Sequence, residues 1–206
     1  MELVLASRNA KKIEELRRIL AAAGLDAVVR GPEAFTDLPE VPETGATFSE
    51  NAMHKAVSVA AATGLVAVAD DSGLCVDALN GMPGVLSARW AGGHGDDAAN
   101  VRLVLDQMRD VPDRRRGAHF ACAAAVAVPG EDGSIVDMRV VEGVAEGVLA
   151  RSPRGERGFG YDPIFVPGGF AVTAAEMTSA EKDAISHRGK ALRSLADLLR
   201  EMIPDS

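Results

Sequence analysis

The pattern of hydrophobic and polar positions at the start of the chain predicts a strand, a helix and a second strand. An apolar run over residues 3–6 predicts the first strand, and apolar residues at helical spacing over 13–23 predict the helix. Gly24 supplies a helix stop, and residues 26–30 can form the next strand. Such alternation of strands and helices is typical of an α/β fold.

A second helix and a buried strand are predicted next. Thr47 and Glu50 form a possible capping box for a helix that runs towards Thr63. Residues 65–68 then predict a buried strand, which is followed by the adjacent carboxylates of Asp70 and Asp71. We expect this acidic pair to emerge at the carboxyl edge of the sheet, where α/β folds keep their ligand crevice, with side chains pointing to opposite faces.

The remainder of the chain predicts more helices and a β-hairpin. Asp96 or Asp97 can cap a helix. Two apolar segments, 119–128 and 135–144, are joined by Pro-Gly-Glu-Asp-Gly, which predicts a hairpin. The last part of the chain predicts a helix whose apolar face holds Leu192, Leu195, Leu198, Leu199 and Met202. Together these elements predict an α/β fold with a mixed sheet.

Composition and charge narrow the classes of function. The chain has 206 residues, of which 47% are hydrophobic, and a formal net charge of -8. The negative charge argues against a general nucleic-acid binder or a membrane-surface protein. No segment approaches the roughly 20 apolar residues of a transmembrane helix. Because no repeat or linker divides the sequence, we expect a single domain over residues 1–206. From the charge and the lack of a long apolar segment, we expect it to bind neither nucleic acid nor membranes.

The cysteines indicate the compartment. Cys75 and Cys122 are the only two, and both lie in segments predicted as buried strands. Two reduced core thiols are therefore expected rather than a disulfide, which favours the cytoplasm.

The turn from Ser7 to Lys12 is the first candidate for chemistry. Free backbone N–H groups, the positive end of a helix and two lysines come together there, which suits a phosphate chain. The turn lacks the Walker A pattern. The alternative is that Asn9 only caps the helix while Lys11 and Lys12 are solvated.

The acidic pair is the second candidate. Two carboxylates as close as Asp70 and Asp71 repel each other unless a cation or a proton lies between them, and hard oxygen ligands suit Mg²⁺. Glu43 or Glu40 can complete such a site. The alternative is that one aspartate caps a turn while the other is solvated.

The third candidate is the segment Gly158 to Pro163, where two aromatic residues and an acid lie among glycines. A planar ring can stack on Phe159 or Tyr161 while Asp162 accepts hydrogen bonds from it. The alternative is a tight turn whose aromatic side chains belong to the core.

The fourth candidate is the segment 181–188. Lys182, His187 and Arg188 would place three donors within two helical turns, which suits an anion or an exocyclic carbonyl group. A solvated helix face is the alternative.

Taken together, these motifs resemble one family, the inosine/xanthosine triphosphate pyrophosphatases, also called Ham1-like or RdgB-like. The resemblance extends from Leu3 to about Leu199. It rests on five motifs in the family's order: Ser-x-Asn-x-x-Lys at 7–12, Glu-Thr-Gly at 43–45, Ala-Asp-Asp-Ser-Gly-Leu at 69–74, Phe-Gly-Tyr-Asp at 159–162 and Ser-His-Arg at 186–188. One departure is Arg8, which stands where the family usually has glycine.

The resemblance implies a mixed, twisted central sheet flanked by helices, with two lobes around a nucleotide-binding cleft, in a homodimer. It implies Mg²⁺-dependent hydrolysis of ITP, dITP and XTP to the monophosphate and pyrophosphate. By position, Asp71 is the expected proton acceptor and a metal ligand, and Glu43 is the second ligand. The expected substrate-binding residues are Ser7, Arg8, Asn9, Ala10, Lys11, Lys12, Ser72, Phe159, Gly160, Tyr161, Asp162, Lys182, His187 and Arg188.

Selection of the base is expected at its 6-position. Hypoxanthine and xanthine offer a carbonyl acceptor there, which a donor such as Arg188 or His187 can pair with, whereas adenine offers an amino group. Two alternatives stay open. A Maf-type pyrophosphatase would turn over dTTP or UTP, and a non-enzymatic nucleotide sensor would bind ITP without releasing pyrophosphate.

Overall fold

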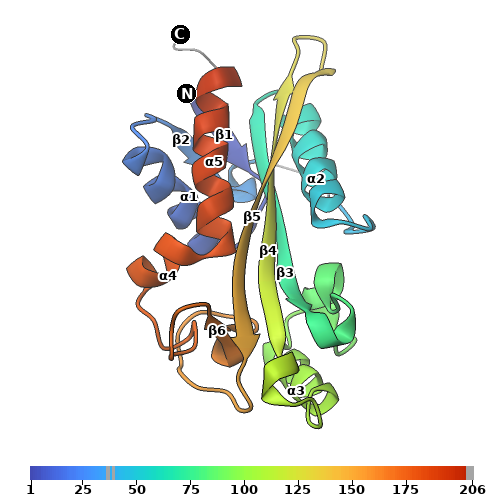
Figure 1. Cartoon of the computed structure of the whole chain (residues 1–206). Coiled ribbons are helices and arrows are strands. Elements are labelled where there is room, and N and C mark those ends of the chain that lie inside the picture. Colours follow the sequence, from blue (N-terminus) through green and yellow to red (C-terminus); the bar gives the residue numbers. More distant parts are fainter. Residues whose placement is uncertain (36–37, 39, 203–206) are drawn as a thin grey trace. The chain divides into compact units, whose positions relative to one another are not determined.

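Six strands form one mixed sheet in the order β2-β1-β3-β4-β5-β6 in the computed structural model, which describes residues 1–35, 38 and 40–202 (Figure 1). The strands are β1 Glu2–Leu5, β2 Val28–Arg30, β3 Val66–Val76, β4 Gly117–Pro129, β5 Ile135–Leu149 and β6 Phe165–Pro167. The α-helices are α1 Ala10–Ala22, α2 Phe48–Thr63, α3 Asp97–Gln107, α4 Ser179–Ile185 and α5 His187–Met202. The prediction of an α/β fold with a mixed sheet is confirmed.

The chain divides into two compact units. Unit 1 contains Met1–Asp71, Cys122–Glu142 and Arg188–Ser206, and unit 2 contains Ser72–Ala121 and Gly143–His187. Strands β3, β4 and β5 contribute residues to both units. Neither unit is a contiguous piece of sequence, so we keep the single domain over residues 1–206 as a proposal.

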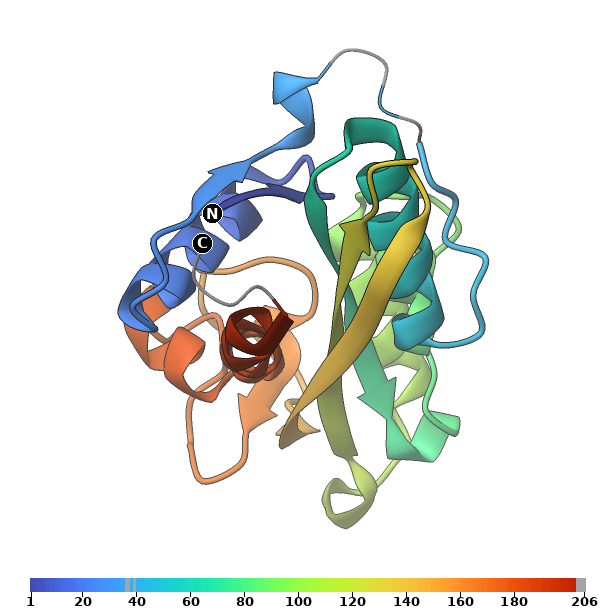
Figure 2. The same ribbon diagram turned by 90° about the horizontal axis from the view of Figure 1, so that it is seen from above.

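Unit 1 has helices on both faces of its part of the sheet. Strand β1 pairs in parallel with β2 and with β3. Alternate strand residues such as Leu3, Leu5 and Val68 pack with α1 and α5, whereas Val4 and Ala67 pack with α2. Figure 2 shows α5 on one side of these strands and α2 on the other. The period-2 alternation of side chains therefore decides which helix each strand residue meets.

The ends of α2 follow the predicted signals only in part. Gly64 ends the helix in the left-handed conformation with a φ of 66°, as its position predicts. Thr47 accepts a hydrogen bond from the backbone N–H of Glu50. The Glu50 carboxylate, however, accepts from the N–H of Ala46 at 2.6 Å, so the reciprocal half of the predicted capping box is made one residue earlier.

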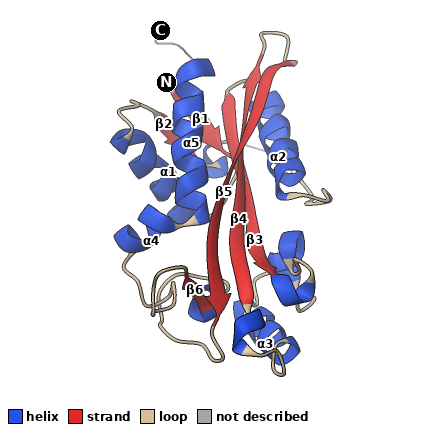
Figure 3. Ribbon diagram, viewed as in Figure 1, coloured by secondary structure: helices blue, strands red, loops and turns tan. Residues whose placement is uncertain are grey.

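Unit 2 packs α3 and the segment around β6 against its own portions of the long strands. Its core includes Val101 and Val104 of α3 and Met108, the residue after that helix, together with Leu74 of β3 and Phe165 of β6. Strand β6 pairs antiparallel with β5. The β4–β5 hairpin predicted from the sequence is present, as the two adjoining long strands in Figure 3 show.

Two local predictions are wrong. Strand β3 does not end before the acidic pair but continues to Val76, because Gly73 lets it pass against the short 3₁₀-helix Gly84–Arg89. A Cβ atom on Gly73 would lie 2.3 Å from Ser87 Oγ and 2.5 Å from the Gly84 carbonyl oxygen. The expected continuous helix over 181–188 is also broken, since α4 ends at Ile185 and α5 starts at His187.

The structure also tests two predictions about the environment. Cys75 and Cys122 are both buried free thiols, as expected. None of the helices within residues 1–35 and 40–202 is long and apolar enough to cross a membrane.

Candidate active site

Asp70 and Asp71 point to opposite faces of β3, as the alternation predicts. Asp70 is paired with cations from α1 and α5, whereas Asp71 meets side chains of α2. Both carboxylates lie in the middle of an 11-residue strand rather than at its end. The turn after β1 still begins beside them, because Leu5 pairs with Val68 and the Ala6 N–H donates to the Val68 carbonyl at 2.8 Å.

The Asp70 carboxylate lies in a buried cluster of charges. Lys12 Nζ donates to Asp70 Oδ2 at 2.6 Å, and Arg188 Nη2 lies 3.4 Å from Asp70 Oδ1. Glu15 Oε2 lies 3.2 Å from Arg188 Nε and balances the second cation. Burial alone would raise the pKa of Asp70, but Arg188 and Lys12 outweigh it and hold that pKa well below its ordinary value. Asp70 therefore stays ionised, and its charge is already balanced.

The Asp71 carboxylate has a different environment. Asn51 Nδ2 donates to Asp71 Oδ2 at 2.8 Å, and Lys55 Nζ lies 3.8 Å from Asp71 Oδ1. The same ammonium group is 2.8 Å from Glu43 Oε1. Burial lowers the pKa of Lys55, but Asp71 and Glu43 more than compensate and raise it above its ordinary value. Two carboxylates thus converge on one position of positive charge.

This arrangement fits a hard divalent cation. The Lys55 ammonium group stands where a cation would meet both Asp71 and Glu43, and carboxylate oxygens are the ligands that such ions prefer. No cluster of three or more His, Cys, Asp or Glu side chains suited to a metal occurs within the described part of the chain. The protein would then supply two carboxylates, which is the number typical of Mg²⁺ sites completed by water and phosphate oxygens.

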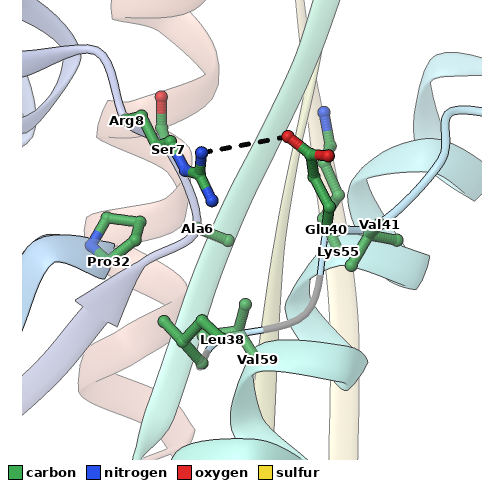
Figure 4. A pocket seen from close by; sticks show the side chains of 9 residues that line it. All are labelled: Ala6, Ser7, Arg8, Pro32, Leu38, Glu40, Val41, Lys55 and Val59. Atoms are coloured by element: carbon green, nitrogen blue, oxygen red, sulfur yellow. Dashed lines mark ion pairs between the residues drawn. The ribbon is translucent and has the colours of Figure 1, made fainter. Parts of the chain in front are cut away.

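The turn before α1 borders a cavity in unit 1. Asn9 caps the helix by accepting from the Lys11 N–H at 3.0 Å, and Ser7 Oγ accepts from the Asn9 N–H at 3.3 Å. Arg8 Nη1 lies 3.9 Å from Glu40 Oε1 at this cavity (Figure 4). Glu40 therefore meets Arg8, and Glu43 is the acid that meets Lys55. The cavity, of about 190 Å³, is lined by Ala6, Ser7, Arg8, Pro32, Leu38, Glu40, Val41, Lys55 and Val59.

In unit 2, the segment 159–162 offers one aromatic face rather than two. Phe159 is 52% exposed, and Lys182 Nζ lies 5.0 Å from the centre of its ring. Tyr161 is buried and donates its hydroxyl to the Ser87 carbonyl at 2.8 Å. Asp162 is buried, accepts from the Phe159 N–H at 2.9 Å and forms an ion pair with Lys182. Phe159 is therefore the ring available for stacking.

The three donors predicted on one helix are distributed differently. Lys182 belongs to α4, and His187 starts α5, where its ring stacks on Phe120 at 4.7 Å between centroids and 11° between planes. Arg188 is assigned to unit 1, where its guanidinium group meets Asp70 and Glu15. The break at Ser186 therefore puts Lys182 in a different helix from His187 and Arg188.

Sequence reasoning missed several polar residues. Asn51 and Lys55 lie four residues apart on α2, which is the spacing for one helix face, and this signal was available once Glu43 was considered. Glu15 follows Lys12 by three residues on α1 and had the same kind of signal. Asp97 accepts the Gly160 N–H at 2.7 Å and so holds the 159–162 segment, but no local pattern links positions 63 residues apart.

Comparison with known proteins decides the family. The model of the Ham1 family matches residues 3–198. The chain belongs to the Ham1 family. A Streptomyces coelicolor protein named dITP/XTP pyrophosphatase is 59% identical over 98% of each chain, and one of the same name from Nocardia farcinica is 61% identical over 95% of this chain and 93% of its own.

Solved structures give the same result for the fold of this Ham1-family chain. A nucleoside-triphosphatase / dITP/XTP pyrophosphatase from Mycobacterium abscessus is 53% identical with a TM-score of 0.78, and covers 97% of this chain and 100% of its own. A HAM1 protein from Coxiella burnetii is 44% identical with a TM-score of 0.87, covering 98% and 99%. The resemblance found in the five motifs is confirmed.

Proposed function

We propose that this Ham1-family chain hydrolyses deaminated purine nucleoside triphosphates, dITP, ITP and XTP, to the monophosphate and pyrophosphate. The observation that carries the proposal is the convergence of Asp71 and Glu43 on one cation position in unit 1, which also contains the basic turn at 7–12. The names of relatives at 59% and 61% identity support the choice of substrate. Removal of such nucleotides would cleanse the nucleotide pool.

The family implies a divalent metal, and we propose Mg²⁺ held by Asp71 and Glu43. When bound, the metal offsets negative charge on the phosphate oxygens. Asp71 would accept a proton from the attacking water, whose oxygen forms a new bond to the first phosphorus. The bond between phosphorus and the oxygen that bridges the first two phosphates breaks, and pyrophosphate leaves.

The turn before α1 would hold the triphosphate. Its backbone N–H groups point from the positive end of α1, and Lys12 adds a charge. Ser7, Arg8, Asn9, Ala10 and Lys11 are proposed to complete this phosphate site. In Ham1 relatives a glycine is usual where this chain has Arg8, so Arg8 adds a cation to the lining of the cavity.

Several residues are proposed to contact the base. Phe159 offers an exposed ring for stacking. Arg188 Nη1 has no hydrogen-bond partner within residues 1–35 and 40–202, which suits a donor to the 6-carbonyl group. The remaining contacts are proposed to come from Ser72, Gly160, Tyr161, Asp162, Lys182 and His187.

Assembly and compartment belong to the same proposal. We propose a homodimer in the cytoplasm, the latter supported by two buried free thiols. Nucleic acid and membranes are not proposed as partners, since the net charge is -8.

A substrate panel tests the proposed function. The purified protein with Mg²⁺ is expected to release pyrophosphate from dITP, ITP and XTP much faster than from ATP, dTTP or UTP. Preference for dTTP or UTP would favour a Maf-type pyrophosphatase instead. Tight ITP binding without release of pyrophosphate would favour a nucleotide sensor.

Lys12→Ala is expected to lower kcat/KM for every nucleoside triphosphate by roughly tenfold or more, since a charged hydrogen bond to phosphate is lost. The ratio of ITP to GTP should stay constant, because a phosphate contact carries no information about the base. Steady-state rates on ITP, XTP and GTP check this. Arg114→Ala, which removes an exposed charge with no assigned role, is the control. A loss confined to one base would show that Lys12 reads the base.

Arg188→Ala is expected to reduce the preference for ITP over ATP in kcat/KM by roughly tenfold or more, because only ITP loses a hydrogen bond. Arg116→Ala is the matched control. Arg116 is also buried, but its guanidinium group donates to the Leu149, Met108 and Ala150 carbonyls. We expect that control to lose stability and keep the preference. Equal losses on ITP and ATP in Arg188→Ala would assign Arg188 to phosphate binding or to the fold.

A further inference from the structure

We propose that Asn51 is a positioning residue, which fixes Asp71 and the Glu43 loop so that both carboxylates face one cation. The inference rests on the proposed function for its meaning, but its evidence is the geometry of one buried amide. Asn51 lies in the first turn of α2 and is 1% exposed. Both of its polar atoms are used.

The orientation of the Asn51 amide is determined at both ends. Its Oδ1 accepts the backbone N–H of Gly45 at 2.7 Å, and its Nδ2 donates to Asp71 Oδ2 at 2.8 Å. A backbone N–H can only donate and an ionised carboxylate can only accept. The reversed amide would place a donor against a donor and an acceptor against an acceptor, so Asn51 can adopt only one of its two orientations here.

The contact with Gly45 is close enough to require glycine. A Cβ atom at Gly45 would lie 2.7 Å from Asn51 Oδ1 and 2.8 Å from Glu50 Cβ. Gly45 is two residues beyond Glu43, so its hydrogen bond ties the Glu43 loop to the start of α2. Asn51 therefore holds Asp71 and also fixes the position of the loop that carries Glu43.

Asn51 also divides the two oxygens of Asp71 between two tasks. With Oδ2 engaged by Asn51, Oδ1 is the oxygen on the side of Lys55 Nζ, at 3.8 Å. Lys55 Nζ contacts Glu43 Oε1 at 2.8 Å, so the Oδ1 side is the side that Glu43 shares. Because the amide is neutral, it orients the carboxylate without cancelling the charge that a metal needs.

The test compares the parent protein with Asn51→Ala and with a matched control, Asn100→Ala. Asn100 is likewise 1% exposed and on a helix, where it accepts the Ala91 N–H at 2.7 Å and donates to the Ala88 carbonyl. Asn100→Ala therefore removes a similar buried amide with two hydrogen bonds, neither of which involves a carboxylate. The readouts are kcat and KM for dITP, and the affinity for Mn²⁺ alone, measured by the loss of the free-ion electron paramagnetic resonance signal.

We expect Asn51→Ala to weaken Mn²⁺ binding and to lower kcat by about 10- to 100-fold each, which is the usual effect of removing a group that orients a metal ligand. KM should change by less than about threefold, since both polar atoms of Asn51 are engaged by Gly45 and Asp71. Asn100→Ala should keep Mn²⁺ affinity and kcat near the parent values. Where Asn51→Ala does not fold, Asn51→Asp serves, because it keeps the acceptor for Gly45 but cannot donate to Asp71, and its kcat should fall at least tenfold.

Three results would overturn the inference. They are unchanged Mn²⁺ affinity and kcat in Asn51→Ala, equal losses in Asn100→Ala, and a parent protein that does not bind Mn²⁺. Failure of the proposed function looks different. The parent would then bind Mn²⁺ more tightly than Asn51→Ala but release no pyrophosphate from dITP, ITP or XTP.

Discussion

Asp71→Asn is expected to lower kcat for dITP by more than about 100-fold while the protein stays folded. The substitution removes both the proton acceptor and one metal charge. It keeps the shape of the side chain and an oxygen that can accept from Asn51 Nδ2, which now donates at 2.8 Å. Rates of pyrophosphate release and a thermal melt measure the two properties. Activity within a few-fold of the parent would remove Asp71 from its proposed role.

Asp70→Asn is expected to lower the free energy of unfolding strongly, whereas Asp71→Asn is expected to lower kcat and stay folded. Lys12 and Arg188 face this fully buried carboxylate, and removing its charge leaves two cations without their common partner. Breaking a buried ion pair from one side typically costs about 3–5 kcal/mol. Urea unfolding of the variant and the parent at pH 7 measures the difference. A loss of activity above about 100-fold with unchanged stability would instead assign the base role to Asp70.

The same ion pairs predict how stability depends on pH. The pKa of Asp70 is lowered in the folded protein, so its contribution is complete above the ordinary pKa of an aspartate, about 4. The contribution is lost as the pH falls through the lower folded-state value. The parent should therefore lose free energy of unfolding in this acid range more steeply than Asp70→Asn. Equal slopes between about pH 5 and pH 2 would contradict the account of Asp70.

Local patterns predicted most of the secondary structure because the relevant signals lie within a few residues. The apolar spacing of α1 and the left-handed glycine after α2 are examples. The course of β3 past Asp71 could not be predicted in this way. Ser72 and Gly73 have the composition of a turn, and only the approach of Gly84 and Ser87 explains why glycine is needed within a strand.

Two features of the sequence predicted parts of the candidate site, namely the alternation of side chains along a strand and the order of the motifs. Alternation along β3 correctly separated Asp70 from Asp71. The pairing of Asp70 with Arg188 joins residues 118 positions apart, and the bond from Gly160 to Asp97 joins residues 63 apart. Such contacts depend on how helices and strands pack, which no short window of sequence contains.

The proposed reaction is hydrolysis between the first two phosphates of a deaminated purine nucleotide. Phosphorus-31 nuclear magnetic resonance of dITP incubated with the purified protein and Mg²⁺ tests it most directly, because each product has its own signal. We expect the triphosphate signals to be replaced by those of dIMP and pyrophosphate in equal amounts, and Asp71→Asn to leave dITP intact over the same period. Appearance of dIDP and inorganic phosphate, or unchanged dITP with the parent protein, would contradict it.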